Sequence, residues 1–80
     1  FNPETTIAYQ LPESAEVRLT IFNTRGALVR TLVNSPQAAG TYTVRWNGRD
    51  DNGAPAPSGV YFYRMTAGEF SALQRMVLLK

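Results

Sequence analysis

The fold is decided by residues 46–64, which read WNGRDDNGAPAPSGVYFYR. This stretch begins on an aromatic residue, runs through polar turn formers and two prolines, and ends in residues that favour strands. Asn and Asp side chains bond nearby backbone amides, the glycines accept positive φ, and Pro55 and Pro57 stiffen an extended path. The stretch therefore predicts a crossing between two strands and not a tight hairpin.

The alternation of apolar and polar residues on either side of this crossing is that of β-strands, with no apolar stripe of helical period. Strands are predicted over 5–11, 15–22, 28–33, 41–46, 60–67 and 70–79, with a loop over 34–40. Asn23 to Gly26 fits a tight turn in which Gly26 takes positive φ. Short strands at this spacing, separated by turn signals, predict an antiparallel β-sandwich.

The same alternation assigns a buried side to each strand. The side chains expected in the core are Ile7, Tyr9, Leu19, Ile21, Val44, Trp46, Tyr61, Tyr63, Met76 and Leu78. The large apolar residues expected to face outward are Phe22, Phe62, Val77 and Leu79. Exposed residues of this kind on a small domain mark a contact surface, although a second core layer and simple edge exposure stay open as alternatives.

The composition argues against several classes of function. The chain has 80 residues, expected to form one domain over 1–80, with no cysteine and no histidine. Because it lacks a nucleophile–base pair, we expect no enzymatic activity, no cofactor and no small-molecule substrate. Its eight basic residues are scattered along the chain, which argues against a nucleic-acid partner. The chain begins at Phe1 without an initiator Met, so we expect it to be a processed or excised part of a larger protein.

Residues Asp50, Asp51 and Asn52 resemble the oxygen-rich start of a calcium-binding loop. A full loop of that kind needs further ligands and a late bidentate Glu, whereas Ala, Pro, Ala, Pro and Ser follow Gly53. The segment is therefore predicted to form an Asx-type turn. Weak calcium binding at Asp50, Asp51 and Asn52 is the open alternative.

Three blocks of sequence resemble known families. The first is the opening FNPETTIAYQLP at residues 1–12, and the second is VRLTIFN at 17–23, followed by Gly26, Val29, Arg30 and Leu32. The third runs from WNGRD at 46–50 through SGVYFY at 58–63 to RMVLLK at 75–80. Together they are similar to the C-terminal sorting domains of type IX secretion cargo and to the immunoglobulin-like domain of the flagellar hook-capping protein FlgD.

This resemblance implies an immunoglobulin-like antiparallel β-sandwich of about seven short strands, in a protein that is secreted or held at the surface of a bacterium. It implies a non-catalytic C-terminal module that directs secretion and cell-surface attachment of an upstream cargo protein through the outer-membrane secretion machinery. The alternative is a structural module that packs against the upstream domain, or that assembles into a surface fibre or flagellar hook cap and self-associates through strand edges. The partner-binding residues expected are Phe22, Phe62, Val77, Leu79 and Lys80.

Overall fold

The computed structural model describes residues 5–79. These residues form six strands, and they contain no helix long and apolar enough to cross a membrane. The strands are β1 (Thr5–Leu11), β2 (Ala15–Asn23), β3 (Leu28–Gln37), β4 (Gly40–Trp46), β5 (Gly59–Ala67) and β6 (Phe70–Leu78).

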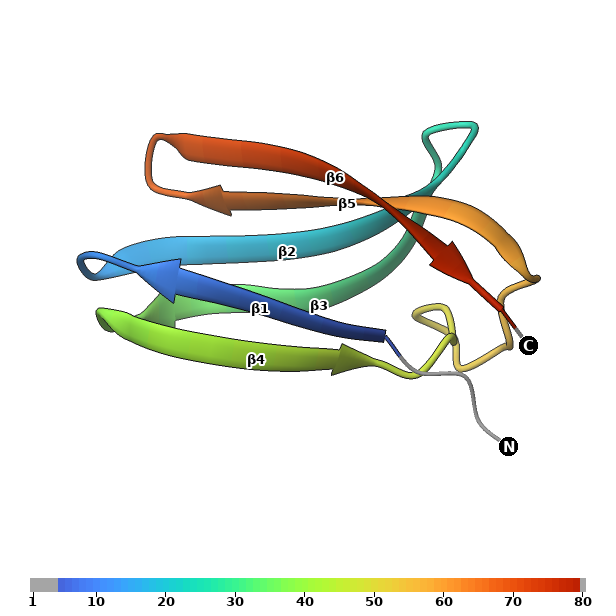
Figure 1. Cartoon of the computed structure of the whole chain (residues 1–80), viewed down its shortest axis with the longest axis horizontal. Helices are drawn as coiled ribbons and strands as arrows, with labels where there is room; N and C mark the ends of the chain where they lie inside the picture. The colour runs from blue at the N-terminus through green and yellow to red at the C-terminus, as the bar shows by residue number, and fades with distance from the viewer. Residues whose placement is uncertain (1–4, 80) are drawn as a thin grey trace.

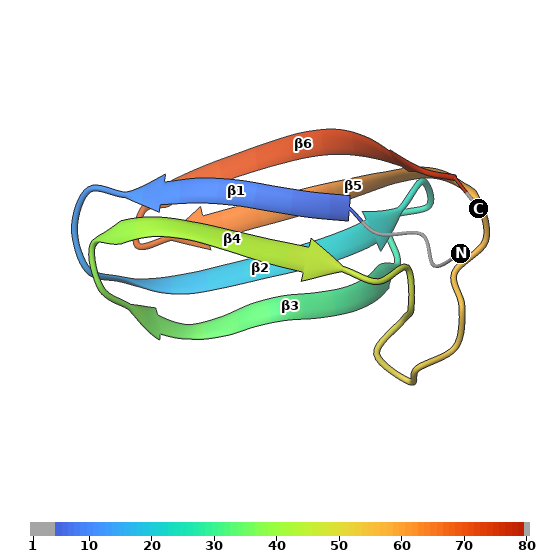
Figure 2. The same ribbon diagram turned by 60° about the horizontal axis from the view of Figure 1, so that its bottom comes forward.

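Two antiparallel sheets face each other as the layers of a sandwich (Figure 1, Figure 2). β1 and β4 form a small sheet of two strands, and the large sheet has the order β3-β2-β5-β6. Residues 47–58 leave the end of β4 in the small sheet and reach the start of β5 in the large sheet. The predicted sandwich and the predicted crossing are both confirmed.

One loop differs from the prediction. The six strands predicted from the alternation are all present within residues 5–79. The crossing adds no further strand to bring the number to the seven that the family resemblance implies, because it contributes only an isolated bridge between Arg49 and Pro55. β3 also continues to Gln37, through residues predicted to be a loop. Pro36 fits there, opposite Glu16, because β3 is at the edge of its sheet, where a missing N–H need not interrupt a ladder.

The turn between β2 and β3 is the predicted one. The Gly26 N–H donates to the Asn23 carbonyl over 3.0 Å, and Gly26 has a φ of 83°. The Asn23 side chain accepts hydrogen bonds from the backbone N–H groups of Arg25 and Ala27, which stabilises the turn from within. The β2–β3 ladder contains two register shifts, the first between Leu19 and Thr20 and the second between Ile21 and Phe22. These shifts break the alternation that would otherwise assign each β3 residue to a face.

The core consists of two apolar clusters, one that contains Leu19 and one that contains Trp46. The expected core residues Ile7, Leu19, Ile21, Trp46, Tyr61 and Leu78 are buried, and the expected core residues Tyr9, Val44, Tyr63 and Met76 are half-buried against these clusters. Met65 and Ala56 are buried as well. Met65 continues the alternation of β5, whereas Ala56 lies in the crossing, where no periodicity marks it.

Trp46, at the end of β4, is the largest of the fully buried side chains. Its ring meets that of Tyr61 edge to face, with the ring centroids 5.3 Å apart. Its indole N–H donates to the Arg49 carbonyl over 2.8 Å, so its one polar atom has a partner although it is buried. One side chain therefore joins β4, the crossing and β5.

Replacing Trp46 by Ala is expected to lower the free energy of unfolding by about 3–5 kcal/mol, because it leaves a cavity at the junction of both sheets. That loss is a large fraction of the stability of a small domain. The measurement is chemical or thermal unfolding of the 80-residue chain. The matched control is Thr43→Ala, at an exposed position of the same strand, which should change stability little. A Trp46→Ala variant that melts within a couple of degrees of the parent would show that the core is assigned wrongly.

Candidate interaction surface

The two sheets turn different kinds of surface to solvent. In the small sheet the positions that alternate with the buried ones are exposed and carry Thr6, Ala8, Gln10, Thr41, Thr43 and Arg45. In the large sheet the corresponding positions include several large apolar residues. The small sheet therefore has an ordinary solvent face, whereas the large sheet exposes surface of the kind that marks a contact site.

The register of the large sheet brings these apolar residues together. Phe22 of β2 lies directly opposite Phe62 of β5, and Leu28 of β3 lies on the other side of Phe22. β6 adds Val77 opposite Val60, and Leu73 opposite Arg64. Residues opposite each other in an antiparallel ladder share one face of the sheet. The outer patch is the name used below for Phe22, Leu28, Val60, Phe62, Leu73 and Val77.

Much of the outer patch is open to solvent. Leu73 is 56% exposed, Leu28 48% and Val77 46%, while Phe22 and Phe62 are half-buried beside them. A hollow of about 320 Å³ opens on this face, lined by Phe22, Asn23, Thr24, Gly26, Phe62, Arg64 and Leu73. The aromatic pair forms part of its wall, so an apolar side chain of another protein could be received there.

Three of the five residues predicted from the sequence to bind a partner, Phe22, Phe62 and Val77, belong to the outer patch. Leu79 lies beyond the end of β6 and is 72% exposed, and Lys80 lies outside the described residues. The other members of the patch, Leu28, Val60 and Leu73, were not predicted. The shared alternation of Leu73 and Val77 on β6 could have revealed Leu73, whereas Leu28 stands next to a register shift.

Arg64 covers part of the outer patch. The carbon at the centre of its guanidinium group lies 5.5 Å from the centroid of the Phe22 ring, in a cation–π contact. Thr20 also lies on this face, yet it is only 3% exposed. It is covered because it stands between Arg18 and Phe22 along β2 and opposite Arg64 on β5. The outer face is therefore a packed surface and not a row of separate side chains.

The two edges of the large sheet differ in whether another segment of the chain covers them. At the β3 edge, the Asp51 N–H donates to the Val29 carbonyl, and the Thr31 N–H donates to the Asp51 carboxylate, each over 3.0 Å. The crossing thereby covers this part of β3. β6 has nine residues, no proline and no register shift, and none of the other described strands pairs with its far side. β6 is therefore an open edge, to which another strand could add.

The acidic residues of the crossing are held by hydrogen bonds. The Asp50 carboxylate accepts the N–H groups of Asn52 and Ala54, each over 2.9 Å, which confirms the predicted Asx-type turn. Asp51 forms an ion pair with Arg30 over 3.7 Å. Among residues 5–79, no group of three His, Cys, Asp or Glu side chains is placed to hold a metal ion.

Two tyrosines have pKa values raised by their surroundings. Burial raises the pKa of Tyr61, whose hydroxyl donates to the Pro57 carbonyl over 2.6 Å. Burial is also the main cause that raises the pKa of Tyr9, which stacks on Tyr42; the negative charge of an ionised Tyr42 raises it further, while the hydrogen bond to Gln37 lowers it. Both rings therefore resist ionisation in the folded chain.

Stability is expected to fall above about pH 10, because the unfolded chain then loses tyrosine protons that the folded chain still holds. This contribution is present in full below about pH 10 and is lost as the pH rises through the folded pKa values. Tyr61→Phe should lower the free energy of unfolding by about 1 kcal/mol at neutral pH, through the lost hydrogen bond to Pro57, and should flatten the alkaline decline. Urea unfolding from pH 7 to 11 measures both. An equally steep decline in parent and variant would contradict the role of Tyr61.

Comparisons with known proteins point to one family. A sequence model of the FlgD Ig-like domain family matches residues 2–70. A solved structure of FlgD from P. aeruginosa superposes with a TM-score of 0.71 at 25% sequence identity, over 94% of this chain and 61% of that chain. This chain thus spans about three fifths of the length of that FlgD structure. A search among curated proteins gave no match.

Proposed function

We propose that this chain, which belongs to the FlgD Ig-like domain family, is a non-catalytic structural module that packs against a neighbouring protein surface. The observation that carries the proposal is the outer patch, because six apolar side chains lie together on one face of the large sheet while the opposite face of the sandwich is polar. Burying such surface stabilises an association in proportion to the apolar area that is removed from water.

The neighbour proposed is the upstream domain of the same polypeptide. The P. aeruginosa FlgD structure supports this choice, since that chain extends well beyond the part that matches this one. Packing between domains of one chain commonly buries interfaces of about 600–1,500 Å², a size that one sheet face can supply. A module of this kind fits a flagellar hook cap or another assembly at the bacterial surface, and the open edge of β6 offers a second contact for such an assembly.

The proposal is tested with the chain alone and with the chain joined to its upstream domain. The upstream domain should raise the melting temperature of this module, by about 4–8 °C for each kcal/mol of packing energy. The double variant Leu73→Thr and Val77→Thr keeps strand propensity but removes exposed apolar surface, so it should abolish most of that rise. In the isolated chain the same variant should melt close to the parent.

The control is Thr43→Ser, on the polar face of the small sheet, which should leave the rise in melting temperature unchanged. If the upstream domain has no effect on the parent, or the same effect on parent and double variant, the outer patch is not the packing surface.

Sorting by type IX secretion machinery is a second candidate function, and the three sequence blocks are what favours it. The family model and the FlgD structure support the structural alternative better. A reporter protein fused ahead of this chain is therefore expected to stay unexported in a bacterium that has the type IX machinery. Attachment of the reporter to the cell surface would instead establish the sorting function.

A further inference from the structure

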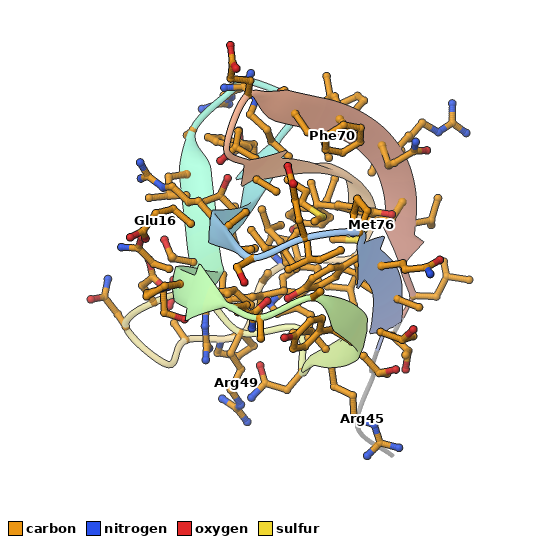
Figure 3. All side chains as sticks on the ribbon, turned by 90° about the vertical axis from the view of Figure 1, so that its left-hand side faces the viewer. Glu16, Arg45, Arg49, Phe70 and Met76 are labelled. Carbon is orange, nitrogen blue, oxygen red and sulfur yellow. The ribbon has the colours of Figure 1, made fainter. Side chains whose placement is uncertain are left out.

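The charged residues that flank the outer patch on β2, β5 and β6 are arginines. Arg18, Arg64 and Arg75 stand opposite Thr66, Thr20 and Phe62 respectively, so none of them has a carboxylate across the ladder. The acidic residue that shares their face is Glu16, near the start of β2 and toward one side of the sheet (Figure 3). Within residues 5–79 the ion pair that forms is Arg30–Asp51, away from this face. Three arginines thus stand against one carboxylate on this face, which gives it an excess of positive charge.

Two of these arginines share a polar hollow. Arg18 and Arg64 are diagonal neighbours on β2 and β5, and the hollow between them has a volume of about 280 Å³. Its lining is Arg18, Thr20, Phe22, Arg64 and Thr66. Two guanidinium groups and the Thr66 hydroxyl offer the donors that a carboxylate accepts. The buried Thr20 hydroxyl donates instead to the Arg64 carbonyl, over 3.5 Å.

The polar hollow adjoins the apolar one, because Phe22 and Arg64 line both. Arg64 is suited to join them. A guanidinium group can stack its face on an aromatic ring while the N–H groups at its rim still donate to a carboxylate. The guanidinium carbon of Arg64 lies over the Phe22 ring, and Arg64 lines both hollows, so its N–H groups can donate to a ligand in either one. The surface thus has a hollow that suits an apolar side chain next to a hollow that suits an anion.

We infer that the outer patch binds an acidic segment of the neighbouring protein. An apolar side chain of that segment fills the hollow beside Phe22 and Phe62, and a nearby Asp or Glu carboxylate pairs with Arg18 and Arg64. This inference rests on the proposed packing function and adds the chemistry of the partner. A second copy of the chain fits this face poorly, because a two-fold contact would bring the arginines of one copy against those of the other.

The test is selection of short random peptides displayed on phage by the immobilised 80-residue chain. The selected peptides should place Asp or Glu next to an aromatic or aliphatic residue. A synthetic copy of a selected peptide should bind at least about tenfold more weakly to the double variant Arg18→Gln and Arg64→Gln, because bonds between charged partners are lost. Its affinity for the parent should also fall as salt is raised from 50 to 500 mM.

The matched control is Arg45→Gln, the same chemical change on the small sheet, where Arg45 points away from the sandwich (Figure 3). It should leave peptide binding unchanged. Selected peptides that are apolar without acidic residues, or binding that is insensitive to salt, would overturn the inference while leaving the packing function in place. Selection of no peptide family at all would count against both. A dimer in sedimentation velocity that Leu73→Thr with Val77→Thr abolishes would identify a second copy as the occupant and also overturn the inference.

Discussion

The burial of Trp46 is the contact on which the rest of the structure depends. The two sheets are linked after β4 by a crossing that belongs to neither sheet, and a chain of 80 residues without cysteine has no disulfide to hold that crossing. Trp46 holds its start through the hydrogen bond to Arg49 and meets Tyr61 beyond its end. Tyr61 in turn bonds Pro57, inside the same crossing. Two aromatic side chains thus fix the path between the sheets.

The position of the crossing determines which edge of the large sheet stays open. Once its start is fixed by Trp46, Asp51 reaches β3 and pairs with the backbone on both sides of Arg30. That contact covers an edge that would otherwise expose unpaired N–H and C=O groups. No equivalent segment of the described chain reaches β6. The path of the crossing therefore makes the two edges different. It covers part of β3 and leaves β6 as the edge that a partner strand can approach.

Much of the fold could be predicted from the sequence because strand periodicity and turn chemistry are local. The alternation of β2 and β5 identifies both the core side and the two outward phenylalanines, and Asn23 with Gly26 identifies the turn. The remainder depends on contacts between distant segments. Pro36 reads as a loop until β3 is known to be an edge strand, and Leu28 cannot be assigned to a face without knowledge of the register shifts. The candidate site was therefore predicted in part, through Phe22, Phe62 and Val77.

The arginines of the outer face reconcile an exposed apolar surface with solubility. A small domain that leaves large apolar side chains in water risks non-specific association. A guanidinium group can lie over an aromatic ring while it remains accessible to water, and the guanidinium carbon of Arg64 lies over the Phe22 ring in this way, 5.5 Å from its centroid. The excess of positive charge on the same face also repels a second copy of the chain. The arginines that cover the patch before binding are thus the residues that would select an acidic partner, because a carboxylate on the partner offsets the positive charge that is buried at the interface.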